Sequence, residues 1–266
     1  MSFNFHTHTV RCNHASGADE EYVLCAIQNG YTVMGFSDHA PYAFPNGHKS
    51  GYRISLEDTQ DYVSSVRALQ EKYKGIIDIR LGFELEYFPD LFDKEIEYLK
   101  SFKYDYLILG QHYTDNEYEP YAKYSGVETD SVAVLDKYIS QVIMGVKTGA
   151  FTYVAHPDLI NFTGDKQVYL KKMAYFVERL KETGIPLEFN FLGYTSKRNY
   201  PNNDFWQIVA KSGNPVIIGL DAHSPNVYGD KENLGKAKEL LNTLGITPIE
   251  LNDLRLINWE GKYEQF

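Results

Sequence analysis

The chain opens with two histidines separated by a single residue, His6 and His8, in the run FNFHTHT. On a β-strand such residues point to the same face and lie about 6.6 Å apart along the strand. Two imidazoles placed in this way can bind one metal ion. A single His-x-His pair is also compatible with ordinary packing, so its meaning depends on where the other histidines fall.

Most of the other histidines share one kind of position, the end of a short apolar run. The eight histidines include six of this kind: His6, His8, His39, His112, His156 and His223. His14 lies in the loop after the first run, Glu84 stands at the end of one further run, and Asp221 shares the last run with His223. If the runs are parallel strands of one barrel, their C-terminal ends meet at one mouth, where barrel enzymes place catalytic groups. Each histidine alone is more simply a core or surface residue, but the joint placement favours one site.

The apolar runs alternate with helical patterns, which predicts an α/β fold with a parallel sheet. The strand–helix units are seven: 3–30, 32–74, 76–102, 105–149, 151–184, 186–213 and 215–244. We expect the first strand over about 3–9 and a candidate extra strand at Thr247–Asn252. The loops 40–54 and 114–128 are long for such connections, which is typical of functional loops. No linker or change of composition divides the chain, so we expect one domain over 1–266.

Composition and charge restrict the class of protein. A length of 266 residues suits one α/β barrel. The net charge of −10 argues against nucleic acid as a partner, because binding its backbone needs a basic surface. Two cysteines, Cys12 and Cys25, are too few for a disulfide framework and indicate a reducing compartment. The sequence shows neither a signal-peptide pattern nor an apolar run near the ~18 residues of a membrane span. We therefore expect a cytoplasmic protein that acts on a small molecule and has no membrane partner.

The number of candidate ligands predicts more than one metal ion. Nine side chains are candidates, whereas one ion takes three or four protein ligands plus water. Two or three divalent ions sharing bridging groups would account for the surplus. Such clusters suit the cleavage of phosphate esters, because one ion activates water while the others bind phosphate oxygens and stabilise the leaving oxygen.

Six separate motifs, in order, carry a resemblance to a known family. They are FNFHTHT, SDHA at 37–40, LGFELE, LGQH, VAHPD and GLDAHSP. Together they resemble the PHP (polymerase and histidinol phosphatase) superfamily from residue 4 to about 225, and its stand-alone histidinol-phosphatase-like branch most closely. The resemblance implies a distorted (β/α)7, TIM-like barrel with a trinuclear metal centre.

The same resemblance implies a ligand set. The first ion would be held by His6, His8, Glu84 and Asp221, the second by His14, His39 and His223, and the third by Glu84, His112 and His156. A metal-bridging hydroxide would be the nucleophile, with Glu84, Asp221 and His223 as catalytic residues. Zn, Mn and Fe all remain candidates, since imidazole-rich sites do not decide among them. Many members have Asp where this chain has His14, and Glu86 is the alternative to Glu84 as the bridging carboxylate.

Substrate contacts are expected from arginine, which binds phosphate through two parallel hydrogen bonds. Arg198 is the first candidate, Arg53 the second and Arg11 the third. Histidinol phosphatases of this superfamily carry an arginine soon after the histidine of the fifth strand, and the corresponding HPDLINFTGD has none. Asp38 and Asp158 flank predicted ligands and are candidates to orient them.

The implied activity is hydrolysis of L-histidinol phosphate to L-histidinol and phosphate, a step of histidine biosynthesis (EC 3.1.3.15). One alternative is a phosphodiesterase or other phosphoesterase acting on nucleotides or oligonucleotides, although the acidic charge disfavours long nucleic acid. The other is a metal-binding barrel with a regulatory or scaffold role, which the complete ligand set disfavours.

Overall fold

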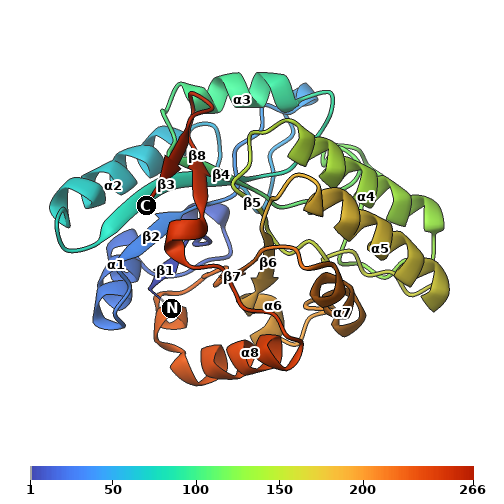
Figure 1. Ribbon diagram of the computed structural model, residues 1–266. Coiled ribbons are helices and arrows are strands. Elements are labelled where there is room, and N and C mark those ends of the chain that lie inside the picture. The colour runs from blue at the N-terminus through green and yellow to red at the C-terminus, as the bar shows by residue number, and fades with distance from the viewer. Residues whose placement is uncertain (1) are drawn as a thin grey trace.

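The computed structural model describes residues 2–266, except for the side chain of Asn46, and contains one parallel sheet of seven strands (Figure 1). The strands follow chain order: β1 (Phe3–Asn4), β2 (Val33–Phe36), β3 (Asp78–Leu85), β4 (Tyr106–Leu109), β5 (Tyr153–Val154), β6 (Leu187–Asn190) and β7 (Val216–Gly219). Every neighbouring pair is parallel. The seven predicted strand–helix units and the (β/α)7 barrel fold are therefore confirmed.

The helices form a ring outside the strands (Figure 1). One long helix follows each strand: α1 (Asp19–Gln28), α2 (Thr59–Lys72), α3 (Phe92–Lys100), α4 (Val132–Lys147), α5 (Lys166–Lys181), α7 (Asn203–Ser212) and α8 (Lys231–Thr243). A short helix, α6 (Phe191–Thr195), starts directly after β6 in a segment that the sequence predicted as loop. Asn190 begins it, because its side chain accepts a hydrogen bond from the Gly193 N–H at 2.8 Å. None of the described helices combines the length and apolar character needed to cross a membrane.

The barrel closes between β1 and β7 at the carboxyl ends of the strands. The ladder between β1 and β2 ends at Asn4, so the regular strand is shorter than the predicted 3–9. The chain then pairs with the end of β7: the His8 N–H donates to the Ala222 carbonyl at 2.9 Å, and the Ala222 N–H donates to the His6 carbonyl at 3.1 Å. Backbone hydrogen bonds thus fix the segment that carries the first two histidines.

The barrel interior is filled by large apolar and aromatic side chains. Tyr106 stands in the middle, and its hydroxyl donates to the Phe5 and Phe36 carbonyls at 2.8 and 3.0 Å. Gly35 and Gly82 leave room for this ring, since a Cβ at either position would overlap Tyr106. The packed interior supports the strand ends from below, as expected when a barrel is a filled core and not a pore.

The C-terminal segment closes the opposite mouth of the barrel. The predicted strand Thr247–Asn252 is wrong: it has no ladder, and only the Ile249 N–H bonds to a strand, at the Val216 carbonyl. Its apolar residues Ile249 and Leu251 pack against the barrel interior instead. A 3-10 helix, η4 (Leu251–Asp253), leads into an antiparallel hairpin of β8 (Arg255–Ile257) and β9 (Tyr263–Gln265), which lies across the strands in Figure 1. Leu254 and Leu256 are fully buried against the barrel interior.

Candidate metal centre

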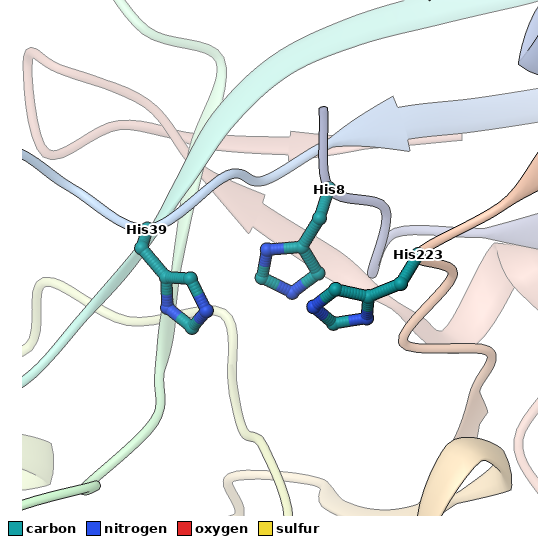
Figure 2. A group of neighbouring side chains, drawn as sticks. All are labelled: His8, His39 and His223. Atoms are coloured by element: carbon teal, nitrogen blue, oxygen red, sulfur yellow. The ribbon is translucent and has the colours of Figure 1, made fainter. Parts of the chain in front are cut away.

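All nine predicted ligands gather at the carboxyl ends of the strands. His6 and His8 follow β1, His39 follows β2, Glu84 lies near the end of β3, His112 follows β4, His156 follows β5, Asp221 and His223 follow β7, and His14 follows the 3-10 helix η1 (Val10–Cys12). Seven of them are buried, His223 is partly exposed and His14 is exposed. Figure 2 shows the rings of His8, His39 and His223 gathered side by side from three separate strand ends.

Glu84 occupies the middle of this cluster. Five imidazole nitrogens lie within 3.6 Å of its carboxylate: His39 Nδ1 at 3.0 Å, His6 Nε2 and His8 Nε2 at 3.5 Å, His156 Nε2 at 2.8 Å and His112 Nε2 at 3.6 Å. The neighbouring strand end has Gly110, where a Cβ would overlap the Glu84 carboxylate. This central position, with its two oxygens facing different histidines, favours Glu84 over Glu86 as a bridging group.

Asp221 is the second carboxylate that faces the imidazoles. Its Oδ1 lies 3.1 Å from His8 Nε2, 3.5 Å from His6 Nε2 and 3.3 Å from His223 Nδ1. Asp221 and His156 have φ angles of 50° and 30°, a left-handed backbone region that non-glycine residues seldom adopt. Such strain persists where the surroundings hold the residue in place, and it concentrates at functional sites.

A second set of groups holds the histidines from behind through Nδ1. His6 Nδ1 lies 2.7 Å from Glu188 Oε1, His8 Nδ1 3.2 Å from Asp38 Oδ1, His112 Nδ1 2.9 Å from Glu86 Oε1, His14 Nδ1 2.7 Å from the Cys12 carbonyl, and His223 Nδ1 2.9 Å from the Asp221 carbonyl. A proton on Nδ1 leaves the lone pair of Nε2 facing the cluster. Metal-ligating histidines are normally oriented in this way.

Several buried atoms in the middle of the cluster have no hydrogen-bond partner. They are His6 Nε2, His8 Nε2, His39 Nδ1 and Glu84 Oε2. An unsatisfied buried polar atom costs about 1–3 kcal/mol, so four of them together call for an explanation. Three ligand groups have their donor atoms within 4.8 Å of one another: His8/His39/His223, His6/His8/Asp221 and His6/Glu84/His156. These nitrogen and carboxylate donors fit divalent metal ions.

The protonation equilibria of the cluster agree with a cation site. Burial and the positive charge of His8 lower the pKa of His39 to about 3, so this imidazole is neutral and able to bind a metal. Burial also lowers the pKa of His8, but the neighbouring carboxylates of Asp221 and Asp38 outweigh it and raise that pKa to about 9. The buried carboxylates therefore create a negative potential at the imidazole Nε2 positions, which attracts positive charge.

A cavity of about 810 Å³ opens onto the exposed side of the cluster. The cavity is lined by five candidate ligands, His14, His39, His112, Asp221 and His223. Four tyrosines from the loops that precede α2, α4 and α7 complete the lining: Tyr52, Tyr113, Tyr124 and Tyr200. The rings of Tyr52 and Tyr113 stack at a centroid distance of 5.8 Å. The cavity thus has a floor of candidate metal ligands and an aromatic wall.

Comparison with known proteins agrees with this geometry. The family model for the PHP domain matches residues 4–191, well over half of the chain. The chain belongs to the PHP family. A protein of Deinococcus radiodurans named "Probable histidinol-phosphatase" is 30% identical over 84% of this chain and 87% of its own length. The histidinol-phosphatase of Bacillus subtilis is 23% identical over 84% of this chain and 94% of its own length.

Solved structures share the PHP fold. A histidinol phosphate phosphatase from Lactococcus lactis, crystallised with zinc, L-histidinol and phosphate, superposes with a TM-score of 0.72 at 18% identity and covers 99% of both chains. A protein of Listeria monocytogenes named "putative histidinol phosphatase hisK" has a TM-score of 0.68 at 19% identity, over 87% of this chain and 99% of the other. At these identities the similarity establishes the fold of the barrel.

The structure of this PHP barrel separates the three arginines that were predicted as substrate contacts. Arg198 lines the cavity, and its Nη1 donates to the Tyr200 hydroxyl at 2.7 Å. Neither Arg53 nor Arg11 lines the cavity. Arg53 is buried in ion pairs with carboxylates, and Arg11 is held by Asp19 and Asp61 at 2.8 and 2.7 Å. Guanidinium groups that are already paired in this way are not free to bind a phosphate.

Two polar residues on β6 belong to the PHP site and were missed by the sequence analysis. Glu188 holds His6, and the Asn190 amide donates to Glu188 at 2.9 Å and to Asp221 at 3.1 Å. Both are fully buried, and Gly219 on β7 leaves room for the Glu188 carboxylate. The run PLEFNF did contain the signal, because two polar residues two positions apart in a buried strand point to the same face. Asp158, by contrast, holds a loop: it accepts from the Asn202 N–H and from the Trp206 indole.

Proposed function

We propose that this chain is a metal-dependent phosphomonoesterase that hydrolyses L-histidinol phosphate to L-histidinol and inorganic phosphate. The observation that carries the proposal is the meeting of nine candidate metal ligands at one end of the barrel, five of them facing one cavity, in a chain 30% identical to a relative named "Probable histidinol-phosphatase". The residues 2–266 that the structure describes would act as one PHP unit, since β7, which lies beyond the matched region, completes the barrel.

We infer that two or three divalent ions, of Zn, Mn or Fe, occupy the cluster. His6, His8, Glu84 and Asp221 would hold the first, His14, His39 and His223 the second, and Glu84, His112 and His156 the third. Bound there, the ions supply Lewis-acid activation of water and of the phosphoryl oxygens. Glu188, Asp38 and Glu86 would keep His6, His8 and His112 in the orientation and tautomer that bind metal.

Cavity residues from the loops would orient the substrate. Arg198 is the guanidinium that faces the cavity and is proposed to bind the phosphate, supported by its contact with Tyr200. The stacked pair Tyr52 and Tyr113 offers a flat aromatic surface of the kind that packs against an imidazole ring or a cationic amine. The substrate would then lie with its phosphate toward the histidine cluster and its side chain along the tyrosines.

The proposal is tested by metal analysis of the purified protein and by phosphate release from three esters. We expect two or three ions per chain and the highest kcat/KM with L-histidinol phosphate, followed by p-nitrophenyl phosphate. Faster cleavage of bis-p-nitrophenyl phosphate would instead indicate a phosphodiesterase. The His6→Ala variant should lose activity and at least one ion, whereas Tyr175→Ala, which removes an exposed ring on the outer helix α5, should keep both.

A further inference from the structure

Arg53 is the most completely enclosed cation near the cavity. It lies in the long loop between β2 and α2, and only 2% of its surface is exposed. Its guanidinium is engaged on every side: Nη1 lies 2.6 Å from Glu86 Oε2, Nε lies 2.8 Å from Glu117 Oε2, and Nη2 donates to the Tyr52 hydroxyl. The Tyr52 and Tyr42 rings pack against it with centroids 4.7 and 5.1 Å away. A guanidinium satisfied in this way is a structural cation and not an open anion site.

Glu86 connects Arg53 to the metal centre. One of its oxygens meets Arg53, and the other, Oε1, lies 2.9 Å from His112 Nδ1 and accepts from the Tyr52 hydroxyl at 2.9 Å. The opposite nitrogen of His112, Nε2, faces Glu84 at 3.6 Å. A path of direct contacts therefore runs from Arg53 through Glu86 and His112 to the carboxylate at the centre of the cluster.

Arg53 also joins the two loops that line the cavity. It belongs to the loop that carries Tyr52, while Glu117 belongs to the loop between β4 and α4 that carries Tyr113 and Tyr124. Glu117 is held further by His48 of the first loop, at 3.6 Å. The aromatic wall of the cavity and the orientation of His112 thus depend on one buried guanidinium.

We propose that Arg53 is a positioning residue, which acts through Glu86 to fix the metal-binding orientation of His112 and to tie both cavity loops to that ligand. Without the cation, Glu86 would be a buried carboxylate short of a partner, which is strongly unfavourable. It would then move toward water and release His112. The inference rests on the proposed metal centre but not on which phosphate ester is the substrate.

The test compares four variants of the metal-loaded protein. Three are the single variants Arg53→Lys, Arg53→Met and Glu86→Gln, and the fourth is the double variant that combines Arg53→Met with Glu86→Gln. The readouts are the rate of metal release to a chelator, the melting temperature, and kcat and KM for p-nitrophenyl phosphate. We expect one ion to leave about 10–100-fold faster in Arg53→Met and Glu86→Gln, as is typical when an outer partner of a metal-binding histidine is lost. The kcat should fall while KM stays within about twofold. The lysine variant should be intermediate, since it keeps the charge but loses the planar fork.

Coupling between the two residues is the decisive result. If Arg53 acts through Glu86, the double variant should release metal no faster than Arg53→Met alone, because the effects of residues in one network are not additive. Arg67→Met is the matched control: Arg67 pairs with Asp105 at 3.1 Å, away from the cavity, and its loss should leave metal release unchanged. Should Arg53→Met fail to fold, Glu86→Gln keeps the test decisive, because it keeps the size of the side chain.

Two results obtained with the metal-loaded protein would overturn the inference. Metal release at the wild-type rate in both Glu86→Gln and Arg53→Lys would show that the network does not hold His112. A rise in KM of tenfold or more with unchanged metal release would show that Arg53 binds the ester itself. If the wild-type protein binds metal but does not hydrolyse histidinol phosphate, the proposed substrate is wrong, while metal release still tests Arg53. If it binds no metal, the proposed metal centre fails and this inference fails with it.

Discussion

At the scale of single residues, the site consists of ligands and of the groups that hold those ligands from behind. The sequence was sufficient to predict that the candidate ligands lie together, because His6, His39, His112 and His156 each stand at a strand end where the fold rule places catalytic groups. Among the groups that hold these side chains, it indicated Asp38, which contacts His8, but missed Glu188. Glu188 lies inside a strand, and nothing in the neighbouring sequence says that its partner is a histidine 182 positions earlier.

Glu188 gives the first prediction at this scale. The Glu188→Gln variant keeps the shape of the side chain but loses the charge that holds the Nδ1 proton of His6. We expect metal affinity to fall by about 10–100-fold, the usual cost of losing an outer carboxylate. Metal content after dialysis against a graded series of chelator concentrations measures this. Glu182→Gln, an exposed carboxylate just beyond α5, is the control; equal metal retention in the two variants would contradict the assigned role.

The arginines show a different limit of sequence reasoning. Arg53 and Arg11 lie in loops next to predicted ligands, which made both reasonable phosphate contacts. Their ion-pair partners Glu117 and Asp61 lie 64 and 50 positions away, respectively. Whether an arginine is free or already paired is a property of the folded chain, so residue type and local position cannot decide it.

At the scale of elements, alternating strands and helices were predictable because each follows from a local apolar pattern. The spacing between adjacent strand ends was not predictable from such a pattern. At the centre of the cluster it depends on a glycine. Gly110 follows β4, and a Cβ there would overlap the Glu84 carboxylate on β3. A single missing side chain thus gives the central ligand its place.

Gly110→Ala should therefore damage the site more than the fold. We expect a loss of about 1–3 kcal/mol in unfolding free energy, which is the usual cost of overpacking, together with loss of bound metal as Glu84 is displaced. Chemical denaturation and metal analysis measure the two effects. Gly235→Ala is the matched control: its Cβ would meet no atom within 4 Å inside α8, so it should stabilise the protein by about 0.5–1 kcal/mol. Full metal content in Gly110→Ala would show that metal binding does not need the close approach of Gly110 to the Glu84 carboxylate.

The C-terminal hairpin is an element that the sequence analysis missed. A strand was predicted at 247–252 instead, but the apolar side chains there contact the barrel bottom and only one N–H joins the sheet. The hairpin that does form owes its place to Leu254 and Leu256, which fit a barrel opening made by distant strands. Long-range shape of this kind is not encoded in local periodicity.

Leu256→Ala tests the role of the hairpin. Because Leu256 is fully buried among barrel residues, its truncation should cost about 2–5 kcal/mol of unfolding free energy. The site lies at the other end of the strands, so activity per folded molecule should stay at the wild-type level. Val132→Ala, at a half-exposed position that begins α4, should change stability far less. If Leu256→Ala instead lost activity while its unfolding free energy changed little, the hairpin would influence the site directly.

At the scale of the whole molecule, the protein has a net charge of −10. It also contains a buried carboxyl group that makes its unfolding free energy depend on pH. Glu95 on α3 is 3% exposed, and its Oε1 has no hydrogen-bond partner. Burial raises the pKa of Glu95 to about 8, with the positive charge of Arg53 opposing the shift. Between its ordinary pKa of 4.5 and about 8, the folded protein therefore binds a proton that the unfolded chain has released.

This excess proton fixes the sign of a pH effect on stability. Since the folded state binds more protons, the unfolding free energy falls as pH rises through this window, by at most ~1.4 kcal/mol per pH unit from this group. The contribution of Glu95 is complete below pH 4.5 and lost above about pH 8. Glu95→Gln removes the ionisation, so it should raise the melting temperature at pH 8 more than at pH 5. Glu97→Gln, an exposed neighbour on the same helix, should leave the pH profile unchanged, and parallel profiles for Glu95→Gln and wild type would show that Glu95 ionises normally in the folded protein.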